Sequence, residues 1–555
     1  MPIRSFFHGR RRTAAVALTL AATLGLSACS SGSSENADDG GKPVAGGTLK
    51  VAFWPDNGAF SCVDPFQTYW TEHRTVIRNL ADSLTDQDPK TGEIKPWLAK
   101  SWEIAPDGLS YTFSLRDDAT FSDGTPVDAE AIKANVDGWL ATVKATSGIA
   151  FGASYVLGLK SAEVVDPTTV TINFTRPNSS FLQATSTTNL GIISPDSYQK
   201  TPQERCLGEF TASGAFTLDS YKPNELLTIK KRPGYAWGSA LSKNTGEAYL
   251  DTVEFSYVAE DSVRTGNLVS KAVDIAWPRN PFTVEDRELI KSSDATVKSR
   301  PLPGVSNAFF PNASEGRPLS DVKVRKAVVK ALDLKSYAST IFGDDYPVVG
   351  GAFDSTTPFY EAQNDALAFD KAGAEKLLDD AGWTVGEGGY RYKDGQKLTL
   401  KEMVQVTTPG DELVQDQLKQ VGIDLVIDVV PAAERPAATT NGAYDLIGNY
   451  FTRADPGALQ FLLNPDLANS KALALNAADP ETRSKILALF TKASETTDEA
   501  VTAQAYSELQ KLLIDQAVVI PVFERVQYAG VSNAVHGFAY TSESFLKLND
   551  VWKNQ

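Results

Sequence analysis

The first side chain with assignable chemistry is the thiol of Cys29, which stands at the end of an amino-terminal apolar run. Four arginines within residues 4–12 precede that run, which covers residues 13–26, and the small residues Ser27 and Ala28 stand directly before the cysteine. The run is too short to cross a bilayer core of about 30 Å as a stable helix, and no cationic stop follows it. We therefore predict that residues 1–28 are a signal peptide, and the thiol of Cys29 is a possible acyl acceptor.

The order Leu-Ser-Ala-Cys at residues 26–29 resembles the signal of bacterial lipoproteins, which is cut before the cysteine. Residues 29–46 are rich in Ser, Gly, Asp and Asn and are expected to form a flexible tether, whose root-mean-square span is roughly 20 to 25 Å. The resemblance implies an exported protein that is anchored to the outer face of the cytoplasmic membrane by lipid attached to Cys29. Two alternatives stay open: an ordinary secretory signal with a cysteine there by chance, and twin-arginine export directed by Arg11 and Arg12.

Cys62 and Cys206 are the thiols that remain once Cys29 is lipidated. In an oxidising compartment, two remaining cysteines most simply form a disulfide. In the chain-entropy model, a bridge across so long a loop contributes up to about 5 kcal/mol of stability. The alternative is two separate buried thiols.

Two short motifs are typical of an acyl-transfer enzyme. Ser320 and Lys323 form a Ser-x-x-Lys, and residues 90–92 read Lys-Thr-Gly. Together they are similar to motifs of penicillin-recognising hydrolases, but in those enzymes the serine motif comes first, whereas here it comes second. The sequence has no Gly-x-Ser-x-Gly elbow, phosphate-binding Walker loop or dinucleotide-binding glycine string. We therefore predict a protein without catalytic residues or a cofactor.

Metal-ligating residue types are present but poorly spaced. His73 and His536 are isolated, and the third histidine leaves with the signal, so a dedicated zinc site is not expected. Asp86 and Asp88 begin like a calcium loop, but Gly92 comes one place too late for one. We interpret these acids as solvated surface charges.

The composition is that of a large acidic globular protein. The chain has 53 Lys and Arg against 69 Asp and Glu, a formal charge of −16, and loss of the four signal arginines takes it to −20. Such an acidic chain is not expected to bind nucleic acid. An apolar fraction of 42% excludes a disordered chain, and about 510 residues after the tether are too many for one hydrophobic core. We expect two or three large domains.

Strands and helices alternate in the local patterns, which indicates an α/β fold. Residues 48–53 read as a strand that opens the fold. Two later strands alternate apolar with polar residues, and their apolar positions are Tyr111, Phe113 and Leu115, then Val170, Ile172 and Phe174. These strands imply a sheet-containing segment near residues 80–205.

Helical spacing takes over in the later part of the chain. Apolar residues recur three and four positions apart in two segments: Val324, Ala327, Val328, Ala331 and Leu332, then Ala374, Leu377, Leu378 and Ala381. Ser320 or Asp321 is placed to cap the first helix, and Gly382 to end the second. A helix over residues 412–421 that runs into a strand over residues 425–430 is typical of a doubly wound α/β unit.

Several blocks of sequence match the pattern of one known family. They are residues 96–103 (PWLAKSWE), 111–116 (YTFSLR), 121–126 (FSDGTP), 318–333 (PLSDVKVRKAVVKALD), 374–383 (AEKLLDDAGW) and 520–523 (IPVF). With these blocks, the chain resembles family 5 extracellular solute-binding proteins of ABC importers, which include oligopeptide, dipeptide and nickel receptors. The resemblance implies an α/β, two-lobe periplasmic-binding-protein-like fold of the large three-domain class (type II, cluster C), with a hinge between the lobes.

The resemblance also implies how the chain divides. Domain I would comprise residues 47–80, 211–302 and 518–555, with domain II inserted as residues 81–210, and domain III, the second lobe, would be residues 303–517. The chain would cross between the lobes near residues 301–305 and 517–521, where a hinge would let the cleft close on a ligand. Cys62 and Cys206 would then flank the inserted domain, which favours the disulfide.

In proteins of this kind, loops that follow several strands line the cleft, where aromatic area and a few polar groups hold a small solute. The candidate ligand-binding residues are Phe53, Trp54, Tyr69, Trp70, Trp277 and Arg279 from the first lobe and Asn307, Phe309, Tyr450, Arg453 and Asp455 from the second. Core packing is an equally open alternative for each aromatic side chain taken singly.

Residues 450–456 read Tyr-Phe-Thr-Arg-Ala-Asp-Pro. In the peptide receptors, an aspartate after the aromatic residue pairs with the α-amino group of a bound peptide, and a further acid and a proline follow. Aligned on the proline, Asp455 matches the later acid, and Thr452 or Arg453 occupies the place of the amine-binding aspartate. A guanidinium suits a carboxylate or phosphate and repels an ammonium. Three alternatives follow: the alignment slips and Asp455 serves the amine, the ligand is not an ordinary peptide held by its N-terminus, or Arg453 and Asp455 simply pair with protein charges. We favour the second.

The resemblance predicts a non-enzymatic, membrane-anchored substrate-binding component of an ABC importer, which captures a peptide or peptide-like solute and delivers it to the permease. We expect a monomer whose partners are the solute, the permease with its cytoplasmic ATPase subunits, and membrane lipid through Cys29, without nucleic acid, metal or cofactor. Two alternatives remain. The protein is an exported lipoprotein of the same fold that acts as a sensor or chaperone, or it binds a non-peptide solute such as an oligosaccharide, metal chelate or acidic metabolite.

Overall fold

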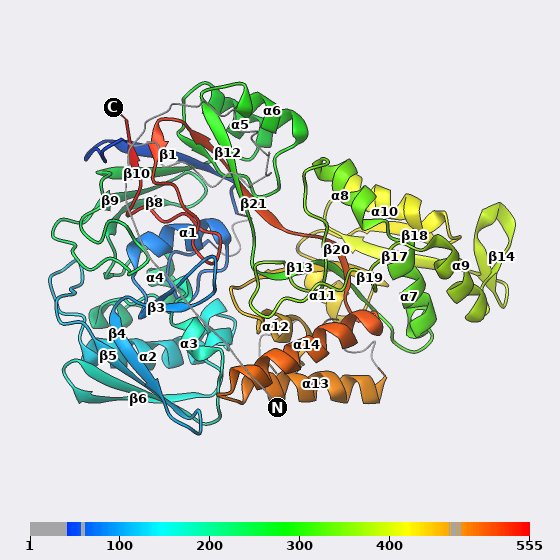
Figure 1. Cartoon of the computed structure of the whole chain (residues 1–555), viewed down its shortest axis with the longest axis horizontal. Helices are drawn as coiled ribbons and strands as arrows, with labels where there is room; N and C mark the ends of the chain where they lie inside the picture. Colours follow the sequence, from blue (N-terminus) through cyan, green and yellow to red (C-terminus); the bar gives the residue numbers. More distant parts are fainter. Residues whose placement is uncertain (1–40, 57–60, 466, 468–472, 474–478, 555) are drawn as a thin grey trace, which may run out of the picture. The chain divides into compact units, whose positions relative to one another are not determined.

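The computed structural model describes residues 41–56, 61–465, 467, 473 and 479–554 (Figure 1). The predicted signal peptide, the predicted lipidation site Cys29 and most of the predicted tether lie outside the described residues. Among the helices in the described ranges, none has both the length and the apolar character needed to span a bilayer.

A seven-stranded sheet organises the first lobe, in the strand order β12-β21-β11-β1-β10-β9-β8. The strands are β1 (Thr48–Phe53), β8 (Phe216–Lys222), β9 (Leu226–Lys231), β10 (Thr252–Tyr257), β11 (Ile275–Ala276), β12 (Ala295–Pro301) and β21 (Val526–Ser532). Helices α1 (Thr71–Leu80), α5 (Asp261–Val269) and α6 (Val284–Lys291) pack against these strands. β1 is the predicted opening strand and lies in the middle of the sheet, parallel to β10 and β11. The sheet thus gathers strands from three distant parts of the chain.

A four-stranded antiparallel sheet, in the order β4-β5-β7-β6, is inserted between β1 and β8 in the sequence. Its strands are β4 (Ala99–Ile104), β5 (Ser110–Leu115), β6 (Leu159–Asp166) and β7 (Thr169–Phe174), and α2 (Ala129–Ala145) packs on β6 and β7. The same segment holds β2 (Thr85–Gln87), β3 (Ile94–Pro96), α3 (Phe181–Ala184), α4 (Pro202–Cys206) and the 3-10 turns η1 (Phe151–Tyr155), η2 (Thr188–Leu190) and η3 (Pro195–Gln199). β5 and β7 bury every second residue, which confirms the alternation read from the sequence.

The second lobe is built on a five-stranded sheet, in the order β18-β17-β19-β13-β20. Its strands are β13 (Gly304–Pro311), β17 (Thr399–Val404), β18 (Asp424–Val429), β19 (Leu446–Thr452) and β20 (Ile520–Phe523). Its helices are α7 (Val322–Ala331), α8 (Leu334–Phe342), α9 (Lys371–Asp380), α10 (Pro409–Lys419), α11 (Arg435–Thr440), α12 (Ala458–Leu463), α13 (Pro480–Ser494) and α14 (Glu499–Asp515). Short turns and strands complete the chain: η4 (Pro318–Ser320), η5 (Glu387–Gly389), β14 (Thr384–Val385), β15 (Arg391–Lys393), β16 (Gln396–Lys397), β22 (Val535–His536) and β23 (Trp552–Lys553).

The helices predicted from apolar spacing are confirmed. Asp321 caps α7 by accepting a hydrogen bond from the Lys323 N–H, and α9 is followed by Gly382 in the left-handed conformation (φ +84°). The helix predicted over residues 412–421 is α10, which begins three residues earlier because Thr408 supplies a capping box and Pro409 takes the first helical position. α10 packs against β18, which runs parallel to β17, so this is the predicted helix-to-strand unit.

The chain passes between the two lobes at two places. The first is at residues 301–304, between β12 and β13. The second is at Glu524 and Arg525, between β20 and β21, which Figure 1 shows as consecutive red strands in different sheets. The expected boundary at residues 517–518 therefore comes too early, because β20 pairs with β13 and buries its apolar side chains in the second lobe.

Cys62 and Cys206 form a disulfide in the structure. Next to it, the Val63 N–H donates to the Cys206 carbonyl at 3.0 Å, and Arg205 forms a buried ion pair with Asp64, with Nε and Oδ2 2.5 Å apart. The bridge spans 144 positions of sequence. Covalent, hydrogen-bonded and ionic contacts thus close the base of the inserted segment together.

Candidate ligand-binding site

Three of the aromatic residues expected to line the cleft lie in hydrophobic cores instead. Phe53, Trp277 and Phe309 are 0%, 1% and 4% exposed. Phe53 and Trp277 pack edge-on with their ring centroids 6.3 Å apart, because the central strand β1 is buried on both faces at its end. The expectation that these side chains face a ligand was wrong. Asn307 is half-buried in β13, opposite Phe523 at a register shift, and no described contact joins it to the other candidates.

Five other candidates come together where the lobes meet, and we call them the Arg279 cluster. They are Trp54, Tyr69, Trp70 and Arg279 from the first lobe and Tyr450 from the second. The guanidinium carbon of Arg279 lies 4.2 Å from the ring centroid of Trp70 and 4.9 Å from that of Trp54. Its Nη2 is 3.5 Å from the Tyr450 hydroxyl, and Tyr69 packs edge-on against Trp70 at 5.6 Å.

The elements of both lobes explain why the Arg279 cluster forms. Trp54 directly follows β1, Trp70 is the residue before the first turn of α1, and Arg279 follows the short strand β11. Since β11 is paired with β1, their carboxyl ends lie at the same edge of the sheet. Tyr450 lies near the end of β19, and its side chain is partly exposed. The cluster is therefore held by backbone that regular hydrogen-bonding fixes on both sides.

The Arg279 cluster is a positively charged site. Burial lowers the pKa of Arg279, but Tyr450 and Glu72 together outweigh this effect, so the pKa is raised overall. Burial raises the pKa of Tyr450, whereas Arg279 and Arg525 lower it, and the pKa is lowered overall. Burial raises the pKa of Tyr69 to about 12. The site therefore presents the Arg279 guanidinium among aromatic side chains.

Arg453 and Asp455, the candidate pair on the second lobe, bind each other. Arg453 Nε donates to Asp455 Oδ2 at 2.7 Å, and the two side chains are 3% and 2% exposed. Arg453 Nη1 donates to the Ser154 hydroxyl at 3.1 Å, and the guanidinium carbon lies 3.9 Å from the ring centroid of Tyr155. Of the three alternatives raised by the sequence, this is the third. The charge of the candidate Arg453 is neutralised inside the protein, whereas the favoured alternative, a ligand that is not an ordinary peptide held by its N-terminus, stays a prediction.

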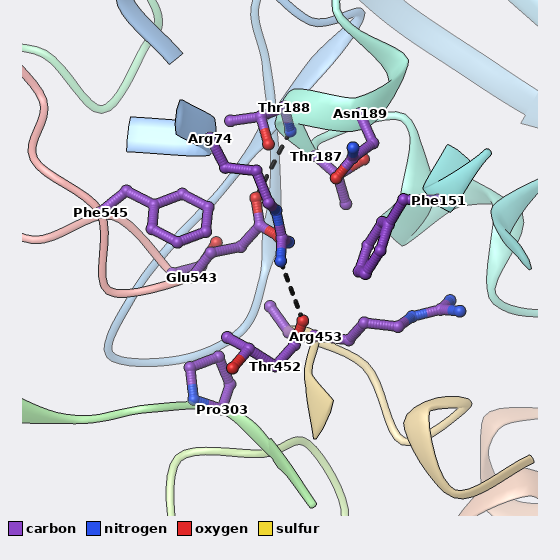
Figure 2. Close-up of polar contacts among 12 residues, drawn as sticks. Arg74, Phe151, Thr187, Thr188, Asn189, Pro303, Thr452, Arg453, Glu543 and Phe545 are labelled. Atoms are coloured by element: carbon purple, nitrogen blue, oxygen red, sulfur yellow. Dashed lines mark hydrogen bonds and ion pairs between the residues drawn. The ribbon is translucent and has the colours of Figure 1, made fainter. Parts of the chain in front are cut away.

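A buried ion pair between Arg74 and Glu543 also reaches the second lobe (Figure 2). Figure 2 shows Arg74 between the rings of Phe151 and Phe545, whose centroids lie 4.7 and 4.9 Å from the guanidinium carbon. Arg74 Nη1 donates to the Thr452 carbonyl at 3.1 Å, across the boundary between the lobes. This contact fixes the backbone of β19 beside the Arg279 cluster.

Sequence reasoning did not find Arg74 or Glu543. They are 469 positions apart, so no local spacing connects them. Arg74 lies in α1, a helix in which every residue from Glu72 to Leu80 is buried, so amphipathic spacing does not distinguish it. The single available signal was its position just after the candidate Trp70.

Several buried polar atoms at this boundary have no hydrogen-bond partner among the described residues. They are Trp70 Nε1, Arg74 Nε, Tyr155 Oη, Gln183 Oε1 and Arg279 Nη1. Arg74, Tyr155 and Arg279 contact second-lobe residues directly. Trp70 and Gln183 reach the second lobe through one intermediate residue, Arg279 and Gln87 respectively. Leaving a buried polar group without a partner costs roughly 1 to 3 kcal/mol. The first-lobe face of the boundary therefore carries unused hydrogen-bonding capacity, most of it as donors.

A separate cavity of about 130 Å³ lies between the inserted segment and the second lobe. Its polar lining includes Ser154, Arg176 and Asn178 from the first lobe and Gln460 and Glu495 from the second. A cavity of this size has room for a few water molecules but is smaller than typical ligand pockets, which begin near 300 Å³. The lining does not include the Arg279 cluster. We therefore treat the Arg279 cluster as the candidate site.

Two α/β lobes joined by two chain crossings, with a polar and aromatic site at their boundary, define a two-lobe solute-binding protein. The sequence model of bacterial extracellular solute-binding proteins, family 5, matches residues 93–471. The chain belongs to this family. Its members are non-enzymatic binding components of ABC transporters, which bind small ligands or peptides and deliver them to the permease.

Individual relatives cover nearly the whole chain. The glutathione-binding protein GsiB of Escherichia coli K12 is 25% identical over 501 residues, which are 88% of this chain and 92% of GsiB. Two solved structures have the same fold. NikA from Brucella suis in complex with Fe(III)-EDTA gives a TM-score of 0.78 at 24% identity over 92% of this chain and 100% of NikA. AppA from Bacillus subtilis in complex with a nonapeptide gives 0.72 at 18% identity over 93% of this chain and 100% of AppA.

Proposed function

We propose that this chain is the lipid-anchored receptor of an ABC importer that binds a peptide-like solute between its lobes and delivers it to the permease. Membership of family 5 supports the receptor role. The lipid anchor rests on the sequence around Cys29. The peptide-like class of the solute rests on the similarity to a relative that is named for binding glutathione, a tripeptide.

One observation supports the boundary between the lobes as the place of binding. Buried donor atoms of Trp70, Arg74 and Arg279 have no partner there in the part of the chain that the structure describes, and Tyr450 of the second lobe meets Arg279 at the same place. A solute that supplies acceptors would remove the cost of these unsatisfied groups, while the aromatic faces would contribute apolar burial at about 25 cal/mol per Å². The site is thus suited to binding and orientation.

The binding step needs no covalent chemistry. A solute bound to Arg279 and Trp70 of the first lobe would also contact Tyr450 of the second, so the bound state would favour closure about the crossings at residues 301–304 and 524–525. Burial between the lobes would then protect the solute until the permease opens them. ATP would be used by partner subunits.

The way a peptide would be held differs from that in the peptide receptors. Thr452 or Arg453 occupies the place of their amine-binding aspartate. The Thr452 carbonyl accepts from Arg74, and its hydroxyl accepts from Arg525 Nη1 at 2.6 Å. Arg453 is paired with Asp455. A solute ammonium has no free carboxylate at this position, which supports a mode of binding that does not depend on the N-terminus.

Native mass spectrometry of the mature protein tests the proposal directly. We expect a co-purified solute of peptide-like mass, and thermal stabilisation by di- to pentapeptides or glutathione in a screen that also contains oligosaccharides and metal chelates. Deletion of the gene should abolish uptake of every solute that stabilises the protein. Stabilisation by oligosaccharides or chelates alone would overturn the peptide-like class, and unchanged uptake after deletion would overturn the transport role.

A further inference from the structure

The half-buried Arg279 is held differently from three buried arginines that pair with carboxylates. Arg205, Arg453 and Arg525 each place a guanidinium edge against a carboxylate, of Asp64, Asp455 and Asp354 respectively. Arg279 forms no ion pair with a carboxylate of the described residues, and its one hydrogen bond is the 3.5 Å contact with the Tyr450 hydroxyl. Its edge is therefore not neutralised by the protein.

The faces of the Arg279 guanidinium are used instead of its edge. Trp70 and Trp54 lie at 4.2 and 4.9 Å from the guanidinium carbon, at distances typical of cation–π contacts. A contact through the faces holds the group in place but leaves its in-plane N–H donors available. Nη1 is buried and has no partner among the described residues. The two rings therefore orient the guanidinium but do not use its hydrogen-bond donors.

A second unused donor lies beside the first. Trp70 Nε1 is also buried without a described partner, and its ring is the one that Arg279 covers most closely. Both groups are donors, so a cation or a donor ligand would not satisfy either of them. A carboxylate has two acceptor oxygens and matches the planar fork of a guanidinium. The donor set thus selects an anionic group with oxygen acceptors.

Glu72 is the acid that most affects the site. It raises the pKa of Arg279 from a distance, and its own carboxylate accepts from the Thr71 hydroxyl at 3.2 Å. If Arg279 served only to balance Glu72, a solute carboxylate would make no difference to binding. In that case Arg279→Gln would weaken the binding of solutes with and without a carboxylate equally.

We infer that Arg279, assisted by Trp70 Nε1, binds a carboxylate of the transported solute and makes this receptor selective for anionic peptide-like solutes. The inference rests on the proposed function and names the charge class of its solute. Tyr450 completes the site from the second lobe, so carboxylate binding and lobe closure are linked. Arg279 is a specificity-determining residue in this scheme, and Trp54 holds it in position.

Matched pairs of probes test the inference. Dissociation constants are measured by calorimetry for a set of Ala-X-Ala tripeptides with a free C-terminal carboxylate and for the same tripeptides as C-terminal amides, with glutathione as an additional acid. Wild-type protein should bind the acid forms at least about 10-fold more tightly than the amides, as expected for one charge-assisted hydrogen-bonding contact. In Arg279→Gln this preference should disappear, because the acid forms should lose at least about 10-fold more affinity than the amides. Arg279→Lys should keep part of it.

Two further variants separate recognition from structure. Trp70→Phe keeps an aromatic ring to support Arg279 but removes the Nε1 donor, so it should weaken the acid forms several-fold more than the amides. Arg176→Gln is the control, because Arg176 is a half-exposed arginine that pairs with Glu495 at the same lobe boundary, and its removal should leave the acid-to-amide ratio as it is. Thermal unfolding of each variant checks that it is folded.

The outcomes distinguish the two proposals. Equal binding of acids and amides by the wild type, or equal weakening of both in Arg279→Gln, overturns the carboxylate assignment but keeps the receptor. If wild-type protein binds none of these probes and carries no co-purified peptide-like solute, the proposed function fails and the inference fails with it. Loss of the preference for acid over amide probes in Arg279→Gln, but not in the control Arg176→Gln, supports both the receptor role and the carboxylate assignment.

Discussion

Replacing Glu543 by Gln is expected to destabilise the first lobe by about 3 to 5 kcal/mol, the usual cost of leaving one member of a buried ion pair without its partner. Arg74 is almost completely buried between Phe151 and Phe545, so its charge would have no access to water (Figure 2). The hydrogen bond to the Thr452 carbonyl would remain, but a neutral carbonyl does not replace a carboxylate.

Removing Arg74 instead of Glu543 should destabilise the protein in the same way, because a buried negative charge is then left without its partner. Arg74→Met leaves Glu543 buried with one remaining described hydrogen bond, a 3.4 Å contact from the Thr188 N–H, and should cost a similar amount. In the double variant Arg74→Met with Glu543→Gln, neither charge is left, and two side chains of similar volume fill the space. We expect the double variant to lose only about 1 to 2 kcal/mol, mainly from the Thr452 contact.

Thermal unfolding with tryptophan fluorescence measures the effect. At roughly 2 °C per kcal/mol for a unit of this size, each single variant should unfold about 6 to 10 °C lower and the double variant less than about 4 °C lower. The control is the exposed pair Lys133 and Asp137 on α2, where Lys133→Met should change the midpoint by less than about 1 °C. If the two single shifts simply add in the double variant, the charges are not coupled and the reasoning is refuted.

Three other predictions follow from the chain. Burial, helped by the neighbouring Asp411, raises the pKa of Glu402 to about 8. Since the unfolded value is near 4.3, the stability that neutral Glu402 provides is complete below that pH and is lost as the pH rises through 8. Wild-type protein should therefore lose about 3 kcal/mol of unfolding free energy between pH 5 and pH 7.5 through this group, and Glu402→Gln should not show that loss. An equal pH dependence of the unfolding free energy in the variant and the wild type would contradict this. Replacing Cys62 and Cys206 by Ala should lower the unfolding free energy by about 2 to 5 kcal/mol in urea titrations, and reduction should have the same effect only on the wild type. Cys29→Ser should release the mature protein from the membrane fraction and abolish labelling by palmitate, whereas retention in that fraction would contradict lipid anchoring.

Local elements could be predicted because their causes are local. The alternation in β5 and β7 reflects one buried face, and the ends of α7 and α9 follow from Asp321 and Gly382, which lie within a few residues of the helices they end. The start of α10 was misplaced where Thr408 and Pro409 act as a cap, a signal present in the sequence but not used.

The candidate site could be predicted only in part, because contacts across the lobes depend on tertiary packing. Residue type and position suggested Trp54, Trp70 and Arg279, which the structure brings together, but the same rule selected Phe53 and Trp277, which face the core. A one-residue step along a strand turns the side chain to the other face, so Phe53 and Trp54 differ in role although they are adjacent.

The second-lobe segment around Thr452 is occupied by contacts within the protein. In the peptide receptors the aspartate near position 452 serves a peptide amine, whereas here Thr452 binds Arg74 through its carbonyl and Arg525 through its hydroxyl. Both arginines are already paired, with Glu543 and Asp354, so the segment has become a packed junction between the lobes. A solute then finds no free carboxylate there for an ammonium.

The unused charge at the boundary lies on the first lobe instead. Arg279 carries a positive charge on a face that offers donors, and it meets the second lobe through Tyr450, two positions before Thr452. A Thr452 and Arg453 segment without a free carboxylate and a guanidinium without a carboxylate partner among the described residues act in the same direction, since each disfavours a cationic group and the second favours an anionic one. The two observations come from different lobes and depend on different contacts, so together they support an anionic solute more strongly than either does alone.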